Sequence, residues 1–212
     1  MLTKLQLKTL IGLVLVVFAT VLLIQGRTVR ASDFYHAFSY VVTVVTVAVV
    51  VWERYLWHLW PFQPHLHTRP DLRGTWKGEL VSDYREPRTG EQKPPFEVYL
   101  VIRQTYSTID VRLFSHESSS VSLSADLCTD SVGLYTLASI YRNVPTVLRR
   151  EKSPISHGGF LLNVRGTPTH QLDGEYWTDR NTKGEAIFTS RCKDEAHDFG
   201  HAQRFRYRSL TK

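Results

Sequence analysis

The chain has 212 residues, of which 42% are hydrophobic and 22% are charged, and its formal net charge is +6 at pH 7. This length suits one domain and leaves no room for two full catalytic domains or a long repeat array. The apolar residues are concentrated in two stretches, residues 9–26 and 34–52, which contain no Asp, Glu, Lys or Arg. The composition therefore excludes a water-soluble monomer, an intrinsically disordered chain and a large polytopic transporter.

The two apolar stretches predict a pair of N-terminal transmembrane helices within residues 1–58. Residues 10–24 read LIGLVLVVFATVLLI, close to the ~20 residues that a helix needs to cross a bilayer. Residues 38–52 are rich in valine, which favours strands in water. A lone strand in lipid leaves its backbone groups unpaired, so a helix is predicted here too. A cleaved signal peptide is the alternative for the first segment, because Lys4 and Lys8 precede its apolar core.

Residues at the ends of these segments predict how they lie in the membrane. Aromatic residues flank the second segment as an interfacial belt does; they are Tyr35, Tyr40, Trp52, Tyr55, Trp57 and Trp60. The basic residues near the segment ends are Lys4, Lys8, Arg54, Arg69 and Arg73, against Arg27 and Arg30 in the connection. Because basic residues are retained on the cytoplasmic side, the N-terminus and the C-terminal part are both predicted to face the cytoplasm.

A polar domain is predicted after the membrane part. Residues 59–70 contain three prolines and predict an extended linker. Residues 71–212 carry 20 Lys and Arg against 18 Asp and Glu, a balance that argues against a nucleic acid polymer as partner. Apolar and polar residues alternate along the domain, as in half-buried strands. Strands are predicted near residues 75–82, 96–104, 109–114, 120–127, 133–142, 159–165, 171–178 and 184–192.

Eight short strands without an amphipathic helix between them predict a membrane-anchored all-β protein. A compact antiparallel eight-stranded β-barrel, lipocalin-like and able to hold one small ligand, is the favoured architecture, and a two-sheet sandwich is the alternative. In residues 120–127 the alternation predicts one face with Val121, Leu123, Ala125 and Leu127, opposite a second face with Ser120, Ser122, Ser124 and Asp126. The Gly-x-Trp sequence at Gly74 and Trp76 is similar to the first strand of lipocalins, whose indole packs across the closed end; an ordinary core tryptophan is the alternative.

No arrangement of residues predicts catalysis. The sequence SHGG at residues 156–159 places a hydroxyl beside an imidazole, but adjacent residues rarely face each other as nucleophile and base, so a loop and strand entry is predicted. His197 and His201 are four residues apart, yet the segment lacks the Glu of a metalloprotease motif. Cys128 and Cys192 lack CxxC spacing and are predicted to be free thiols in the core. The sequence therefore predicts neither an enzyme nor a metal or cofactor.

Polar and aromatic residues gather near the ends of two predicted strands. Residues 134–145 read LYTLASIYRNVP and residues 171–184 read QLDGEYWTDRNTKG. Such side chains can stack on a base, bond to its edge and neutralise a phosphate. The candidate ligand-binding residues here are Tyr141, Arg142, Asn143, Tyr176, Trp177, Thr178, Arg180 and Thr182. The alternative is that the aromatic residues fill the barrel core and the arginines are solvated.

These segments also carry a resemblance to a known family. The order of two membrane helices, LRGTWKGEL, YLVIRQTYSTIDVRLFSHESSS, YRNVP, SHGG and GEYWTDRNTKG resembles the two-transmembrane, β-strand-rich effectors of bacterial CBASS antiphage systems, over essentially the whole chain. The resemblance implies a multi-pass protein of the bacterial inner membrane whose cytoplasmic barrel binds a cyclic dinucleotide made by a partner synthase. It also implies that ligand binding promotes homo-oligomerisation, after which the helices act on the membrane lipids, disrupt the bilayer and kill the infected cell.

The ligand that the resemblance implies has two negative charges, and on chemical grounds Arg180 is the first choice for the phosphates, supported by Arg142 or Arg103. The candidates for base stacking are Tyr141, Tyr176 and Trp177. Because neighbours on a strand alternate, Tyr176 and Trp177 face opposite sides, and at least one of them is structural. The candidates for reading base edges or ribose hydroxyls are Asn143, Thr178 and Thr182. The alternative function is a membrane-anchored, lipocalin-like carrier of a lipid or another small apolar ligand.

Overall fold

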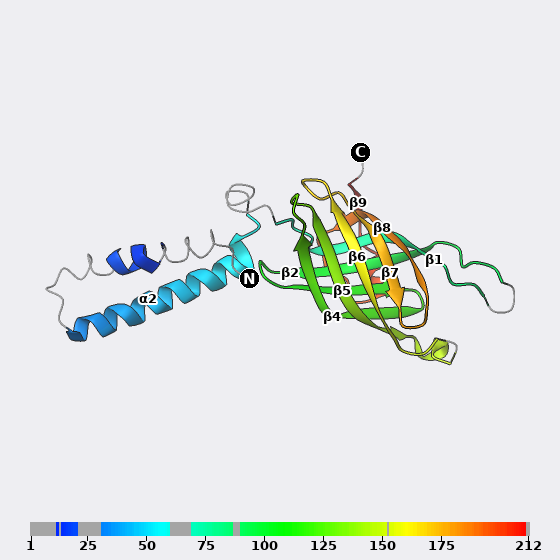
Figure 1. The fold of residues 1–212 in the computed structure, drawn as a ribbon, viewed down its shortest axis with the longest axis horizontal. Helices are drawn as coiled ribbons and strands as arrows, with labels where there is room; N and C mark the ends of the chain where they lie inside the picture. The colour runs from blue at the N-terminus through cyan, green and yellow to red at the C-terminus, as the bar shows by residue number, and fades with distance from the viewer. Residues whose placement is uncertain are drawn as a thin grey trace. The chain divides into compact units, whose positions relative to one another are not determined.

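The structure is a computed structural model that describes residues 12, 14–20, 31–59, 69–86, 90–151 and 153–210. The chain divides into two compact units, Met1–His67 and Thr68–Lys212 (Figure 1). The predicted linker over residues 59–70 lies mostly outside the described residues.

The N-terminal unit contains the helix α2 (Ala31–Val51), which continues into a short π-helix, η1 (Trp52–Leu56). The helical prediction for the valine-rich segment is thus confirmed. The Thr43 hydroxyl donates to the Ser39 carbonyl at 2.9 Å, so this polar group is satisfied within the helix. Among the described residues, one helix, Phe38–Leu56, is long and apolar enough to cross a membrane. Of the first predicted segment only residues 12 and 14–20 are described, as helix, and a second membrane helix stays a prediction.

The C-terminal unit is a closed barrel of antiparallel strands that follow one another in chain order (Figure 1). The barrel strands are β1 (Gly74–Ser82), β2 (Phe96–Gln104), β3 (Ile109–Ser115), β4 (Ser118–Thr129), β5 (Tyr135–Pro145), β6 (Ser156–Arg165), β7 (Gln171–Thr178) and β8 (Lys183–Cys192). Closure comes from β1, which pairs with both β2 and β8. The predicted eight-stranded barrel is therefore confirmed over the sandwich, because a sandwich leaves the first and last strands unpaired at sheet edges.

The C-terminal residues cover one part of the barrel's outer face. After β8 the chain forms a short helix, α3 (Phe199–Gln203), and a two-residue strand, β9 (Arg208–Ser209), that pairs with β8. Tyr99 and Val101 point out of the barrel and are buried beneath this segment, where Tyr99 stacks on Tyr207 with ring centroids 5.6 Å apart. Both faces of the middle of β2 are thus covered, which agrees with its continuous apolar run at residues 98–102.

Strand β4 departs from the predicted alternation. Its pairing with β5 shifts between Ser122 and Ser124, where a β-bulge occurs. A bulge moves the following residues to the opposite face. Leu127 therefore points into the barrel and is 6% exposed, whereas Val121 and Leu123 point outward and are 43% and 63% exposed. The prediction that these residues and Ala125 share one face is wrong, because Ala125 and Leu127 pack in the core whereas Val121 and Leu123 do not.

Two smaller predictions also need correction. The segment SHGG is the first part of β6 rather than a loop, since residues 156–163 pair with β5. The two cysteines are free, as predicted, but they lie outside the core: Cys128 is exposed and Cys192 is half-buried. The shift in β4 places Cys128 on the outer face, beyond the bulge.

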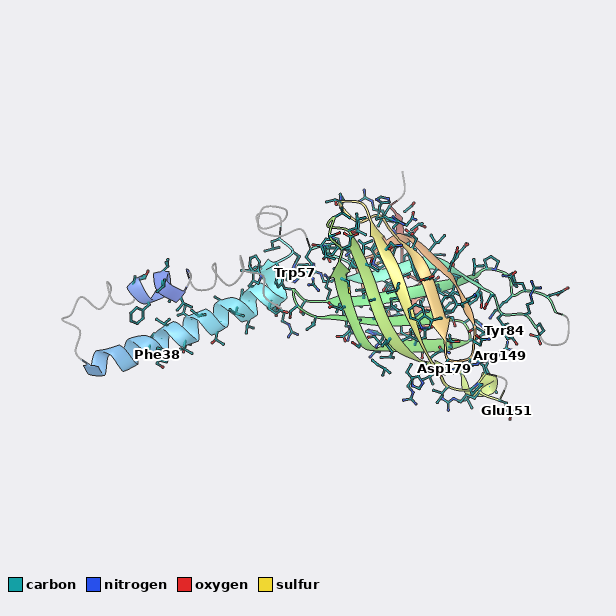
Figure 2. The ribbon with its side chains drawn as sticks, in the orientation of Figure 1. Phe38, Trp57, Tyr84, Arg149, Glu151 and Asp179 are labelled. Carbon is teal, nitrogen blue, oxygen red and sulfur yellow. The ribbon has the colours of Figure 1, made fainter. Side chains whose placement is uncertain are left out.

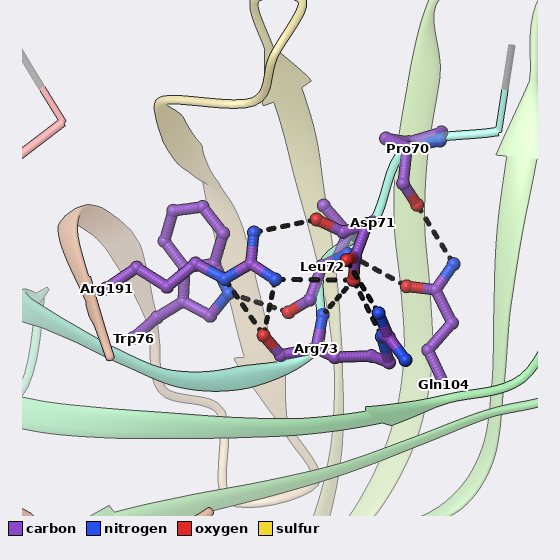
Figure 3. A network of polar contacts seen from close by, with 7 residues as sticks. All are labelled: Pro70, Asp71, Leu72, Arg73, Trp76, Gln104 and Arg191. Carbon is purple, nitrogen blue, oxygen red and sulfur yellow. Dashed lines mark hydrogen bonds and ion pairs between the residues drawn. The ribbon is translucent and has the colours of Figure 1, made fainter. Parts of the chain in front are cut away.

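Trp76 lies near the start of β1, beside a network of polar contacts (Figure 3). Its side chain is fully buried, its Nε1 donates to the Leu72 carbonyl at 2.8 Å, and the Arg191 guanidinium lies 5.2 Å from its ring centroid. Arg191 also donates to the carbonyls of Asp71 and Arg73, each at 2.8 Å. Burial raises the pKa of Asp71, but the bonds from Arg73 and the charge of Arg191 outweigh it, so the pKa lies below its ordinary value. The carboxylate and two guanidinium groups thus form a satisfied polar layer over the indole.

The residues before β1 are bound to β2 as well. Gln104 accepts a hydrogen bond from the Leu72 amide at 2.9 Å and donates to the Pro70 carbonyl at 3.0 Å. Residues 70–73 are therefore tied to β2 by Gln104 and to β8 by Arg191, across the seam where the barrel closes (Figure 3).

Candidate functional site

The end of the barrel opposite Trp76 contains a cavity of about 640 Å³. The connections after β1, β3, β5 and β7 meet at this end, which we term the mouth. Figure 2 shows Tyr84, Arg149 and Asp179, from three of these connections, at the same end of the barrel. The volume lies within the roughly 300–1,000 Å³ of pockets that bind small molecules.

The cavity wall changes from apolar to polar toward the mouth. Its deep part is formed by the inward residues of the strands; they are Leu80, Val98, Leu100, Leu113, Phe160, Leu162, Ala186 and Phe188. The polar side chains nearer the strand ends include Ser82, Ser115, Ser118, Ser120, Asn143, Thr178 and Thr182. A ligand that fits this wall has an apolar or aromatic part and a polar part.

Two tyrosines supply flat surfaces on the wall. Tyr141 is 8% exposed and stacks on Phe160 with ring centroids 6.0 Å apart. Burial raises the pKa of Tyr141 and also that of Tyr176, so both phenols stay neutral donors at physiological pH. Glycines leave room for both rings: a Cβ at Gly158 lies 2.6 Å from the Tyr141 hydroxyl oxygen, and one at Gly184 lies 2.7 Å from the Tyr176 ring. Larger residues at those two positions have no space without moving the tyrosines.

Side-chain hydrogen bonds position polar groups around the tyrosines. The Ser120 hydroxyl donates to Asn143 Oδ1 at 2.9 Å, which joins β4 to β5. The Thr178 and Thr182 hydroxyls are 2.7 Å apart across the turn between β7 and β8. Arg180 at the tip of this turn donates from Nη1 to Ser153 Oγ in the β5–β6 connection. The turn and that connection are thereby linked over the mouth.

The structure brings six of the nine sequence-predicted site residues together on the cavity wall. They are Tyr141, Asn143, Tyr176, Thr178, Arg180 and Thr182. Trp177, Arg142 and Arg103 point out of the barrel, because each alternates with an inward neighbour. Trp177 is 46% exposed and packs over Gly159, while Arg103 pairs with Glu195. Trp177 is thus the outward member of the Tyr176–Trp177 pair, as alternation requires.

Sequence reasoning missed a charged cluster at the mouth. Glu117, in the turn between β3 and β4, bonds to Lys93 Nζ at 3.1 Å and to Arg149 Nη2 at 3.1 Å. Burial raises the pKa of Glu117, but the hydrogen bond and charge of Lys93 and the charge of Arg149 outweigh it, so the pKa lies below its ordinary value. The three residues come from three different connections. The sequence shows only that each of them lies between two predicted strands, which does not indicate that they meet at the mouth.

The charges on the cavity wall balance among the described residues. Its cations are Lys93, Arg149 and Arg180, and its carboxylates are Glu86, Glu91 and Glu117. A strongly anionic ligand therefore meets both attracting and repelling groups, and only a rearrangement of the mouth separates them.

The described part of the chain contains no group of three or more His, Cys, Asp or Glu side chains placed to hold a metal ion. His197 and His201 stack with ring centroids 5.3 Å apart, the first just before α3 and the second within it, and neither lies on the cavity wall. The mouth therefore offers hydrogen-bond donors, flat rings and cations for binding.

Comparison with known proteins agrees with this geometry. Residues 67–190, more than half of the chain, match the family model described as Cap15, cyclic dinucleotide receptor domain. The chain is also 30% identical over 170 residues to CD-NTase-associated protein 15 from Staphylococcus schleiferi. The aligned residues make up 80% of this chain and 87% of the relative. The matched residues include all eight barrel strands except the end of β8. The chain belongs to the Cap15 cyclic dinucleotide receptor family of CBASS effectors.

Proposed function

We propose that this protein is an inner-membrane CBASS effector that binds a cyclic dinucleotide at the mouth of its barrel, oligomerises and then disrupts the bilayer. The observation that carries the proposal is the cavity within the family-matched residues, with an arginine, two tyrosines and an asparagine on its wall. Two flat phenols suit two bases, and Arg180 suits a phosphate. The polar serine and threonine side chains near the strand ends suit ribose hydroxyls and base edges.

A panel of cyclic dinucleotides tests the binding step. The purified full chain in detergent is expected to gain thermal stability with one member of the panel. A ligand at 100 times its dissociation constant contributes about 2.7 kcal/mol, which raises the Tm by about 5–10 °C for a domain of this size. Linear dinucleotides of the same bases are the control. An unchanged Tm across the whole panel contradicts the proposal.

The outer face of the barrel supports the proposed assembly step. An apolar patch crosses four adjacent strands, β4 to β7, and consists of Val121, Leu123, Ile140, Leu161 and Trp177. Each of these side chains is between 39% and 63% exposed. The bulge in β4 contributes to the patch by pointing Leu123 outward. A contiguous apolar patch on a polar surface is typical of a contact between proteins.

The charges on either side of this patch suit a second copy of the chain. The row nearer the mouth contains Arg112, Arg142 and His157, which share one register across β3 to β6. The row nearer the base contains Asp126, Glu175 and Glu185, which are in register with Ala138 and Leu161 across β4 to β8. In a two-fold pair of barrels, the basic row of one copy faces the acidic row of the other while the apolar patches meet.

Ile140→Asp is expected to separate binding from assembly. The side chain is 59% exposed on the outer face, so the substitution leaves the cavity intact and places a charge at the centre of the patch. The variant should keep the ligand-induced rise in Tm, remain in its ligand-free size on sedimentation, and release no dye from lipid vesicles.

The control for Ile140→Asp is Ile187→Asp, at an outward position on β8 that is 45% exposed and outside the patch. It should assemble and release dye as the wild type does. Normal ligand-induced assembly of Ile140→Asp contradicts the assigned surface.

The lipid-carrier alternative has support only from the deep part of the cavity. Leucine, valine and phenylalanine side chains line that part, as an apolar ligand requires. The Arg, Tyr and Asn side chains nearer the mouth argue against a carrier, because an apolar ligand leaves them without partners when it covers them. A lipid that co-purifies with the full chain and is displaced by no cyclic dinucleotide, as judged by mass spectrometry, favours the carrier.

A further inference from the structure

The Glu117 carboxylate pairs with two cations at the mouth, Lys93 and Arg149. A phosphate group can bind the same pair of cations. Its two carboxylate oxygens divide between them: Oε2 lies 3.1 Å from Lys93 Nζ, and Oε1 lies 3.1 Å from Arg149 Nη2. All three side chains are on the cavity wall. A phosphate is larger, carries more acceptor oxygens, and binds such a pair of cations by the same charge-assisted hydrogen bonds.

The backbone holds Glu117 in place while its side chain remains able to move. The Ser115 hydroxyl accepts hydrogen bonds from the amides of Glu117 and Ser118, at 3.3 Å and 3.0 Å, and the Glu117 carbonyl accepts one from the Thr146 amide at 2.9 Å. The side chain itself is 40% exposed, beside partners that are 36% and 51% exposed. Ion pairs in such exposed positions are weak, so a ligand anion can replace the carboxylate without unfolding the turn.

We propose that Lys93 and Arg149 form a second phosphate subsite, in addition to Arg180, and that the Glu117 carboxylate occupies it in the ligand-free protein as a built-in competitor. The proposal rests on the proposed function, because it assigns a partner to the second phosphate of the same ligand. Arg180 bonds to the Ser153 hydroxyl rather than to a carboxylate. A phosphate can therefore bind Arg180 directly, whereas at Lys93 and Arg149 it first has to displace the Glu117 carboxylate.

Occupation of the subsite has a structural consequence. Glu117 joins the β1–β2, β3–β4 and β5–β6 connections, since Lys93, Glu117 and Arg149 belong to one each. When a phosphate replaces the carboxylate, the side-chain ion pairs from the β3–β4 turn to its two neighbours are lost and the ligand takes over their role, while the backbone bond from Thr146 to Glu117 remains. A ligand with a single anionic group, already held at Arg180, has nothing to displace Glu117 and leaves the mouth in its ligand-free arrangement.

Glu117→Gln tests the proposal in the full chain in detergent, with binding measured by calorimetry. Removal of the competing charge is expected to tighten cyclic dinucleotide binding about 10-fold, while Lys93→Gln and Arg149→Gln weaken it about 10-fold. In the Glu117→Gln background, Lys93→Gln should also weaken binding about 10-fold. Glu79→Gln, at an exposed carboxylate outside the cavity, is the control and should bind as the wild type does.

Weaker or unchanged binding by Glu117→Gln overturns the proposal, because it shows that the carboxylate supports the cations or contacts a base instead of competing with the phosphate. Inorganic pyrophosphate is the second probe, and Glu117→Gln should raise the Tm gained from it. If the variant gains this protection but neither protein binds any cyclic dinucleotide, the anion subsite stands and the proposed function fails. If both proteins bind a cyclic dinucleotide equally, the subsite fails and the proposed function stands.

Discussion

Arg180→Ala is expected to weaken cyclic dinucleotide binding about 10- to 100-fold. Hydrogen bonds to charged groups contribute about 1.5–3 kcal/mol, and each 1.4 kcal/mol is a factor of ten in affinity. The structure favours the upper part of this range, because the Arg180 guanidinium is bonded to Ser153 across the mouth and its backbone amide to Thr178 within the turn before any ligand binds. Arg180→Lys should lose less, since it keeps the charge but not the two-pronged donor geometry.

Calorimetry of the full chain in detergent measures this loss. Arg165→Ala is the matched control, because Arg165 lies at the far end of β6 and pairs with Asp173 outside the cavity. Equal affinities of the wild type and Arg180→Ala for the ligand contradict the phosphate role. If Arg165→Ala loses as much affinity as Arg180→Ala does, the loss comes from the change in net charge instead.

Trp76→Ala is expected to cost about 3–5 kcal/mol of unfolding free energy, the range for deletion of a large buried aromatic side chain. The indole is fully buried, and its loss removes the partner of the Leu72 carbonyl and the surface beneath Arg191. At about 2–4 °C per kcal/mol for a domain of this size, the Tm should fall by about 6–20 °C.

Thermal unfolding followed by near-ultraviolet circular dichroism measures this change. Trp76→Phe keeps most of the volume but not the Nε1–H donor, so it should retain most of the stability. Trp177→Ala, at an outward tryptophan that is 46% exposed, is the control and should change the Tm little. A small effect of Trp76→Ala shows that the indole does not support the base.

Strand number and barrel closure could be predicted because each strand has a short alternating pattern that a closed barrel buries on one side. Strand β4 shows where that reasoning stops. Residues 120–127 of its sequence SSSVSLSADLCT alternate across the bulge, so nothing local marks the bulge between Ser122 and Ser124. The bulge is decided by pairing with β3 and β5: Ser122 Oγ accepts a hydrogen bond from the Val111 amide, a bond to a neighbouring strand that a single-strand pattern does not contain.

The candidate site could be predicted in part, on strands and in the β7–β8 turn, where Arg180 and Thr182 lie. Tyr141, Asn143 and Tyr176 were predicted because they belong to segments near strand ends that are rich in polar and aromatic residues. Lys93 and Arg149 were missed, because the position of a connection over a barrel mouth depends on how the connections pack together. Arg103 failed for a different reason: it was chosen for its charge, but its place in β2 directs it outward to Glu195.

The closed base gives the barrel a single opening, so ligand enters and leaves by the same route. Exchange is then governed by how often the four connections move apart, and a slow opening gives a long residence time. With Trp76, Arg191 and Asp71 packed together at the base, the time over which the receptor responds is set at the mouth.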